Sequence, residues 1–279
     1  MSRILVVANE TIGGRKLLDT VKARAQEDGH EWFLVVPQNR PRHGRVIYDE
    51  AVRDAARVRI DLATQFMQVQ GIPVQAEVGD GDPYQAAMDA ILAHRPDEVI
   101  VSTHPVTQSG WLRRDLVERI RQASGLPVEH VVTDLDHEGL PFVVTLVLAN
   151  QTVGGDDLRE ALKAKAGERD DDRPHLFIVV VPQADGSGEA AAQARERLAT
   201  TLSDLRGEGL VCAGMIGDPD PYTAARNALQ SFHVSEVVVS TLPSERSGWL
   251  RENLIERLRE DTPLPVEHVA QREGAEAAG

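Results

Sequence analysis

The chain has 279 residues, of which 42% are hydrophobic, 27% charged and only 4% aromatic, enough for two ordinary domains with aliphatic cores. A net charge of −14 and a pI near 5.1 exclude non-specific binding to nucleic acid or anionic membranes, because that requires a basic surface. No run approaches the roughly 18 apolar residues of a membrane span, and the first residues lack the hydrophobic region of a secretory signal, so a cytoplasmic location is expected. Cys212 is the single cysteine, which excludes an internal disulfide, and its apolar neighbours predict a buried strand residue.

The predicted elements alternate between strands and helices along the first half of the chain. Short, β-branched apolar runs predict five strands, over 3–8, 31–36, 72–77, 98–102 and 127–131. Apolar residues at helical spacing predict four helices between them, over 14–27, 47–69, 83–94 and 111–122. This order favours right-handed crossovers and a parallel sheet covered by helices on both faces.

The second half of the chain repeats the first. The run over 4–14 returns over 145–155, and 29 of the 53 positions over 79–131 are identical in a gapless alignment with 217–269. Strands are therefore predicted again, over 142–149, 174–181, 209–216, 235–240 and 265–270. A period of about 140 residues is far too long for a solenoid, so each copy is expected to be a domain.

These patterns predict an α/β protein made of two tandem domains. The domains are expected over 1–134 and 141–271, with a short polar join between them. Residues 272–279 are rich in Glu, Ala and Gly and are expected to form a disordered tail.

The loop after the first strand of each copy is the first candidate for a binding site. Open parallel sheets bind ligands at the carboxyl ends of the strands where the strand order reverses, usually strands one and four. The two loops read Asn-Glu-Thr-Ile-Gly-Gly from Asn9 and Asn-Gln-Thr-Val-Gly-Gly from Asn150. Paired glycines that open a helix can offer backbone N–H groups to an anion. The alternative is a glycine-built turn capped by Asn or Thr.

A Gly-Asp-x-Asp-Pro-Tyr motif ends the third strand of both copies, from Gly79 and from Gly217. Asp82 and Asp220 each precede a proline and a helical run, which is the preferred arrangement of a helix N-cap. The two carboxylates could instead hold a divalent ion, but the motif contains no third ligand. We expect capping and no metal.

The loop after the fourth strand carries hydroxyls, a glycine and an arginine in both copies. The segments are Ser102-Thr103-His104 followed by Ser109-Gly110-Trp111-Leu112-Arg113, and Ser240-Thr241-Leu242 followed by Ser247-Gly248-Trp249-Leu250-Arg251. These residues could cradle a phosphate, with Arg as a bidentate donor. Alternatively the serines cap helices, the tryptophans pack and the arginines pair with nearby Glu. No Ser-His-Asp or Cys-His arrangement repeats, so we expect no enzyme.

Together these residues resemble the universal stress protein family. The resemblance rests on five strands and four helices, the Gly-Asp-Pro-like turn, the Ser/Gly loop and the final Pro-Val-x-x-Val strand, and it covers both copies. It implies two flavodoxin-like domains of the adenine nucleotide alpha hydrolase-like type, each with strand order 3-2-1-4-5. It also implies dimerisation through the last strands and, as in some members, binding of ATP.

The ATP-binding motif of that family is altered in this sequence. Asn9 and Asn150 stand where the family has an Asp, and the loops after the fourth strands lack the first glycine pair. Arg114-Asp115 and Glu252-Asn253 fall where the family has a phosphate-binding Gly-Ser. Because Glu252 adds negative charge near the phosphate position, the first copy is expected to be the better nucleotide site.

We therefore expect a non-enzymatic stress-response binding or signalling protein that holds ATP or another adenine nucleotide in its first domain. Two alternatives stay open, a ligand-free scaffold with vestigial sites and an ATP-using enzyme built on Asp80 and Asp82 near Arg113. The last strands would otherwise be exposed edges, so we expect them to pair as an intramolecular pseudo-dimer, which could pair again into a homodimer.

The candidate ligand-binding residues lie in these loops and at the strand ends beside them. In the first domain they are Ala8, Asn9, Glu10, Val36, Gly79, Ser102, Thr103, His104, Ser109, Gly110 and Arg113. In the second domain they are Asn150, Ser240, Thr241, Ser247, Gly248 and Arg251.

Overall fold

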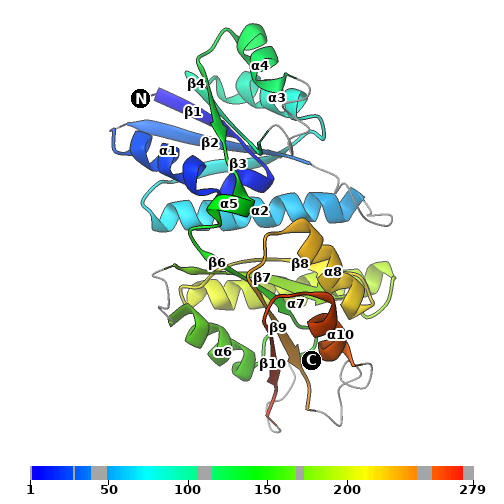
Figure 1. Ribbon diagram of the computed structural model, residues 1–279. Coiled ribbons are helices and arrows are strands. Elements are labelled where there is room, and N and C mark those ends of the chain that lie inside the picture. Colours follow the sequence, from blue (N-terminus) through cyan, green and yellow to red (C-terminus); the bar gives the residue numbers. More distant parts are fainter. Residues whose placement is uncertain are drawn as a thin grey trace. The chain divides into compact units, whose positions relative to one another are not determined.

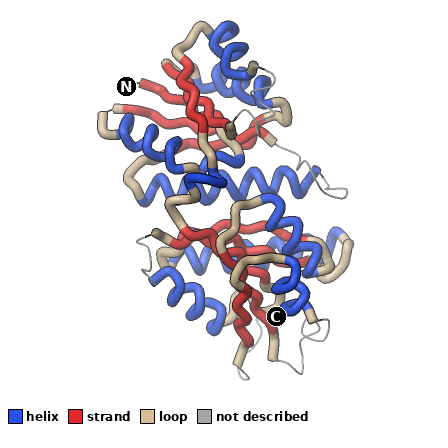
Figure 2. The backbone as a smooth tube through the Cα atoms, viewed as in Figure 1, coloured by secondary structure: helices blue, strands red, loops and turns tan. Residues whose placement is uncertain are grey.

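The chain divides into two compact units, Met1–Pro141 and Phe142–Gly279. A computed structural model describes residues 2–27, 29–38, 49–105, 115–167, 173–243 and 253–272. Each unit is built on one parallel sheet with helices on both faces (Figures 1 and 2).

The first unit has the predicted alternation of strands and helices. Its elements are β1 (Ser2–Val7), η1 (Glu10–Gly13), α1 (Arg15–Ala25), β2 (His30–Pro37), α2 (Asp49–Val69), β3 (Val74–Gly79), α3 (Pro83–His94), β4 (Glu98–Thr103), α4 (Leu116–Ser124), β5 (Val128–Val132) and α5 (Leu135–Glu138). The sheet order is β3-β2-β1-β4-β5, which confirms the predicted order 3-2-1-4-5. The described part of the predicted 111–122 helix begins at Leu116, because 111–114 lie outside the described residues.

The second unit repeats this plan. Its elements are β6 (Val143–Leu148), α6 (Asp156–Gly167), β7 (His175–Pro182), α7 (Gly188–Gly207), β8 (Val211–Gly217), α8 (Pro221–Ser231), β9 (Glu236–Thr241), α10 (Leu254–Asp261) and β10 (Val266–Ala270). The sheet order β10-β9-β6-β7-β8 is the same topology read from its other edge.

Two short helices, η1 and α5, were not predicted. In η1 the N–H of Ile12 donates to the carbonyl of Asn9, which closes a single turn directly after β1. In α5, within the predicted polar join, Asp134 caps the turn by accepting from the N–H of His137 at 3.4 Å. A single turn is too short to show helical periodicity in a sequence.

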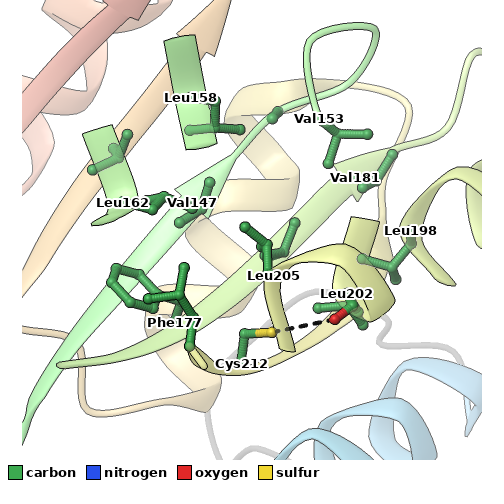
Figure 3. Packing of buried hydrophobic residues seen from close by; sticks show 14 of the residues in the cluster. Val147, Val153, Leu158, Leu162, Phe177, Val181, Leu198, Leu202, Leu205 and Cys212 are labelled. Atoms are coloured by element: carbon green, nitrogen blue, oxygen red, sulfur yellow. Dashed lines mark hydrogen bonds between the residues drawn. The ribbon is translucent and has the colours of Figure 1, made fainter. Parts of the chain in front are cut away.

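Both faces of each sheet are packed. In the first unit Ile4 and Val6 of β1 face α1 and α2, and Leu5 and Val7 face α3 and α4. In the second unit Val147, Phe177 and Leu202 belong to one buried cluster (Figure 3). Cys212 is fully buried in that cluster, as predicted, and its Sγ–H donates to the carbonyl of Leu202 at 3.7 Å.

Three edge strands carry an arginine on their open side. Since the N–H of Val99 donates to the carbonyl of Pro127, the next carbonyl of β5, that of Val128, faces away from the sheet. Arg121 donates to this carbonyl at 3.0 Å. Arg259 makes the equivalent bond to Val266 of β10 at 3.1 Å, and the Nε and Nη2 of Arg206 bond the carbonyl of Cys212 of β8 at 3.1 and 2.9 Å. Each arginine thereby covers part of an edge that would otherwise offer a free acceptor.

None of the helices in the described part of the chain is both long enough and apolar enough to cross a membrane.

Candidate functional site

The carboxyl ends of β1 and β4 lie side by side in the first unit, because Val7 pairs with Val101 in the parallel ladder. The loops that follow these strands therefore meet. Glu10 and His104 join them directly, with Oε2 of Glu10 3.2 Å from Nε2 of His104. The structure thus brings together two residues that are 94 positions apart in the sequence.

Asn9 carries a buried polar atom without a partner at this place. Its side chain is 3% exposed, and its Nδ2 donates to the carbonyl of Pro37 at 2.8 Å. Its Oδ1 accepts no hydrogen bond from the described residues. An unsatisfied buried acceptor costs about 1–3 kcal/mol, so Oδ1 is a point where a donor of a ligand would be stabilised.

The pair formed by Glu10 and His104 belongs to the first unit alone. Nδ1 of His104 is also buried without a partner among the described residues. Gln151 and Leu242 stand at the equivalent positions of the second unit, where this acid–base pair cannot form. The two strand-end sites therefore differ in chemistry.

Arg59 and Arg197, which the sequence analysis did not select, extend the site onto α2 and α7. Burial lowers the pKa of the Arg59 guanidinium, and the nearby Glu10 carboxylate acts in the opposite direction. Nη2 of Arg197 donates to Oδ1 of Asn150 at 3.1 Å. The signal that could have found them is an Ala-Arg-x-Arg sequence at the same distance ahead of the Gly-Asp motif in both copies.

The serine and threonine at the end of β4 and β9 face into each unit. The hydroxyls of Ser102 and Thr133 are 3.3 Å apart and fully buried, whereas Oγ of Ser240 is buried without a partner among the described residues. Thr103 is 2.9 Å from Nε2 of His130, and Thr241 is 2.8 Å from Nε2 of His268. Thr103 and Thr241 thus link β4 and β9 to the edge strands β5 and β10 through side-chain hydrogen bonds.

The last glycine of each Gly-Gly pair is explained by packing. A Cβ on Gly14 would lie 1.9 Å from Cγ2 of Thr133, and a Cβ on Gly155 would lie 1.6 Å from Nε2 of Gln271. The N–H of Gly14 already donates to the carbonyl of Thr11. These contacts favour the glycine-built turn over an anion cradle at this position.

The Gly-Asp-x-Asp-Pro-Tyr motif is a capping turn, as predicted. Asp82 accepts from the N–H of Tyr84 at 2.8 Å, and Asp220 from the N–H of Thr223 at 3.0 Å. Asp80 in turn accepts from the N–H of Asp82 at 2.7 Å. A Cβ on Gly79 would lie 2.6 Å from that of Ala86, so this glycine lets α3 approach the sheet. Within the described residues no group of three His, Cys, Asp or Glu side chains is placed to hold a metal ion.

The remaining predicted site residues fall into two sets. Ala8 and Val36 are fully buried, and the N–H of Ala8 donates to the carbonyl of Val35, so their side chains serve the core. The predicted phosphate-binding residues lie outside the described residues: Ser109, Gly110, Arg113, Ser247, Gly248 and Arg251.

Comparison with solved structures gives a distant likeness to a universal stress protein. No protein-family model and no curated protein matches this chain. A universal stress protein from Archaeoglobus fulgidus DSM 4304 matches over 97% of both chains, with 15% sequence identity and a TM-score of 0.34. A likeness at this TM-score supports no argument about function, and the fold assignment rests on the strand order of each unit.

Proposed function

We propose that this protein is a non-enzymatic stress-response protein of the tandem universal stress protein type, and that it binds an adenine nucleotide in its first unit. The observation that carries the binding proposal is the buried Oδ1 of Asn9 at the carboxyl end of β1, which has no hydrogen-bond partner in the described part of the chain. In open parallel sheets this end of the central strands is where ligands bind.

The chemistry of this position favours the nucleoside part of the ligand. One N–H of the Asn9 Nδ2 donates to the carbonyl of Pro37. Oδ1, which has no partner among the described residues, can only accept, so a ligand group that bonds it must donate. The amino group of adenine and the hydroxyls of ribose are donors, whereas a phosphate offers acceptors. Glu10 beside Asn9 further disfavours a phosphate at this point.

The side-chain oxygens of Asn9 and Asn150 also favour the first unit over the second as the nucleotide site. Oδ1 of Asn150 already accepts from Arg197, so it does not require a ligand. We therefore expect one nucleotide per chain.

The first test is calorimetric titration of the full chain with ATP, ADP and adenosine, together with mass spectrometry of small molecules released on denaturation. We expect one equivalent bound. If Asn9 accepts from the nucleoside, then at least one of purine riboside, 2′-deoxyadenosine and 3′-deoxyadenosine binds about tenfold more weakly than adenosine, which corresponds to about 1.4 kcal/mol. An empty protein that gives no heat with any of these compounds contradicts nucleotide binding.

Two variants locate the site and one tests for catalysis. Asn9→Leu should weaken adenosine binding about tenfold, and the matched control Asn150→Leu should leave it unchanged, with folding of both checked by circular dichroism. Equal losses would place the ligand elsewhere. Turnover of ATP that requires magnesium and disappears in Asp80→Ala would support the ATP-using enzyme instead.

A further inference from the structure

Asn9 and Asn150 occupy equivalent positions but use their side-chain oxygens differently. Oδ1 of Asn9 has no partner among the described residues, whereas Oδ1 of Asn150 accepts from Nη2 of Arg197 at 3.1 Å. Both units carry the arginine that could make this bond, since Arg59 aligns with Arg197. The difference therefore needs a cause other than the loss of a residue.

The residue after each asparagine differs in charge between the two units. In the first unit it is Glu10, whose carboxylate attracts the Arg59 guanidinium. In the second unit it is Gln151, which is exposed and carries no charge. A carboxylate is a stronger partner for a guanidinium than an amide oxygen is. In the second unit, which has no carboxylate at this position, Nη2 of Arg197 is bonded to Oδ1 of Asn150.

We propose that Arg197 closes the strand-end site of the second unit by occupying Oδ1 of Asn150, and that the residue after the asparagine, Glu10 or Gln151, decides whether the site is open or closed. The ligand that an opened site would take is the donor-bearing nucleoside of the proposed function, on which this part rests. The closed and open arrangements themselves exist without any ligand.

The arrangement can be tested on the ligand-free chain by NMR of the asparagine side-chain amides, assigned by their loss in Asn9→Ser and Asn150→Ser. Arg197→Gln should shift the Asn150 amide, and Gln151→Glu should shift it in the same direction, because both remove Arg197 from Oδ1. Gln151→Glu changes an exposed side chain, so it remains informative if Arg197→Gln folds poorly. The matched control Arg59→Gln should leave the NMR resonances of the Asn9 side-chain amide unchanged.

If the chemical shifts of the Asn150 side-chain amide change in neither Arg197→Gln nor Gln151→Glu, the proposal is wrong. An Asn9 amide that responds to Arg59→Gln as strongly as Asn150 responds to Arg197→Gln also overturns it.

The functional consequence is tested by titration with adenosine. The wild-type chain should bind one equivalent, and Arg197→Gln and Gln151→Glu should each bind two. If the wild type binds one and both variants also bind one, Arg197 does not close the second site. If no form binds adenosine, the proposed function fails, while the amide shifts still decide whether Arg197 holds Asn150.

Discussion

The two units share their framework contacts and differ at the strand ends. Arg119 stacks over Tyr84 at 4.1 Å, and Arg257 over Tyr222 at 4.0 Å, so the contact between the third and fourth helices is the same in both units. At the strand ends, the side-chain contact of Glu10 with His104 has no counterpart, because Gln151 and Leu242 stand at the equivalent positions. The duplication has kept the residues that hold the fold and the asparagine, serine and threonine at the strand ends, but Glu10 and His104 are replaced by Gln151 and Leu242. Each unit is thus an internal control for the other.

The largest expected difference between the units concerns the packed glycines. Gly14→Ala should cost about 2–3 kcal/mol, because its Cβ would meet the branched, fully buried Thr133, which has no room to move. Gly155→Ala should cost less than about 1 kcal/mol, because the clashing atom is the far end of the flexible Gln271 side chain. Urea unfolding followed by circular dichroism measures both. Equal costs would show that the two turns pack alike.

A smaller difference is expected at the opposite ends of the sheets, where a cation from the first helix bridges two glutamates. Lys165 bonds Glu236 and Glu267, both at 2.9 Å, and Arg24 bonds Glu98 and Glu129 at 2.7 and 2.9 Å. Burial lowers the pKa of Lys165, but the hydrogen bonds to Glu267 and Glu236 outweigh it, so the pKa is raised.

Replacing these cations should lower the stability of the two units by different amounts, because the two side chains differ in exposure. The Lys165 side chain is 11% exposed and that of Arg24 36%, so solvent screens the second network more. Lys165→Met should destabilise by about 2 kcal/mol and Arg24→Met by about 1 kcal/mol. Arg3→Met, at an exposed pair with Glu31, is the control and should change stability by less than about 0.5 kcal/mol. The reverse order in denaturation experiments would refute the role of burial.

The smallest effect should be common to both units. Burial, followed by the charge of Arg121 or Arg259, lowers the pKa of His130 and His268 below the ordinary value of 6.5. Below about pH 6.5 the unfolded chain then binds more protons than the folded chain, so stability should fall as the pH drops from 7 toward 5. His130→Gln and His268→Gln should each reduce this dependence in denaturation experiments at several pH values. A slope that only one of the two histidines affects would mean that the edge strands differ.

The fold could be predicted because it depends on signals that are local or repeated. Strands and long helices have regular apolar spacing. Signals for the start of a helix also recur in the second copy, such as the N-cap residues Asp82 and Asp220, each followed by a proline. The candidate site was predictable only in part. The role of Gly14 depends on Thr133, and the state of Asn150 on Arg197, and both contacts join distant parts of the sequence. Arg59 and Arg197 could not be found from the loop motifs, because both lie on helices.

The arginines on the edge strands bear on how this protein can assemble. Any chain that adds to β5, β8 or β10 by main-chain hydrogen bonds at the covered carbonyl has to displace Arg121, Arg206 or Arg259 first. Growth of the sheets into aggregates therefore has to break an existing side-chain hydrogen bond at each of three edges, which costs about 1 kcal/mol. The predicted pairing of β5 with β10 would in the same way replace the bonds of Arg121 and Arg259 with main-chain bonds, instead of filling open acceptors at these two carbonyls.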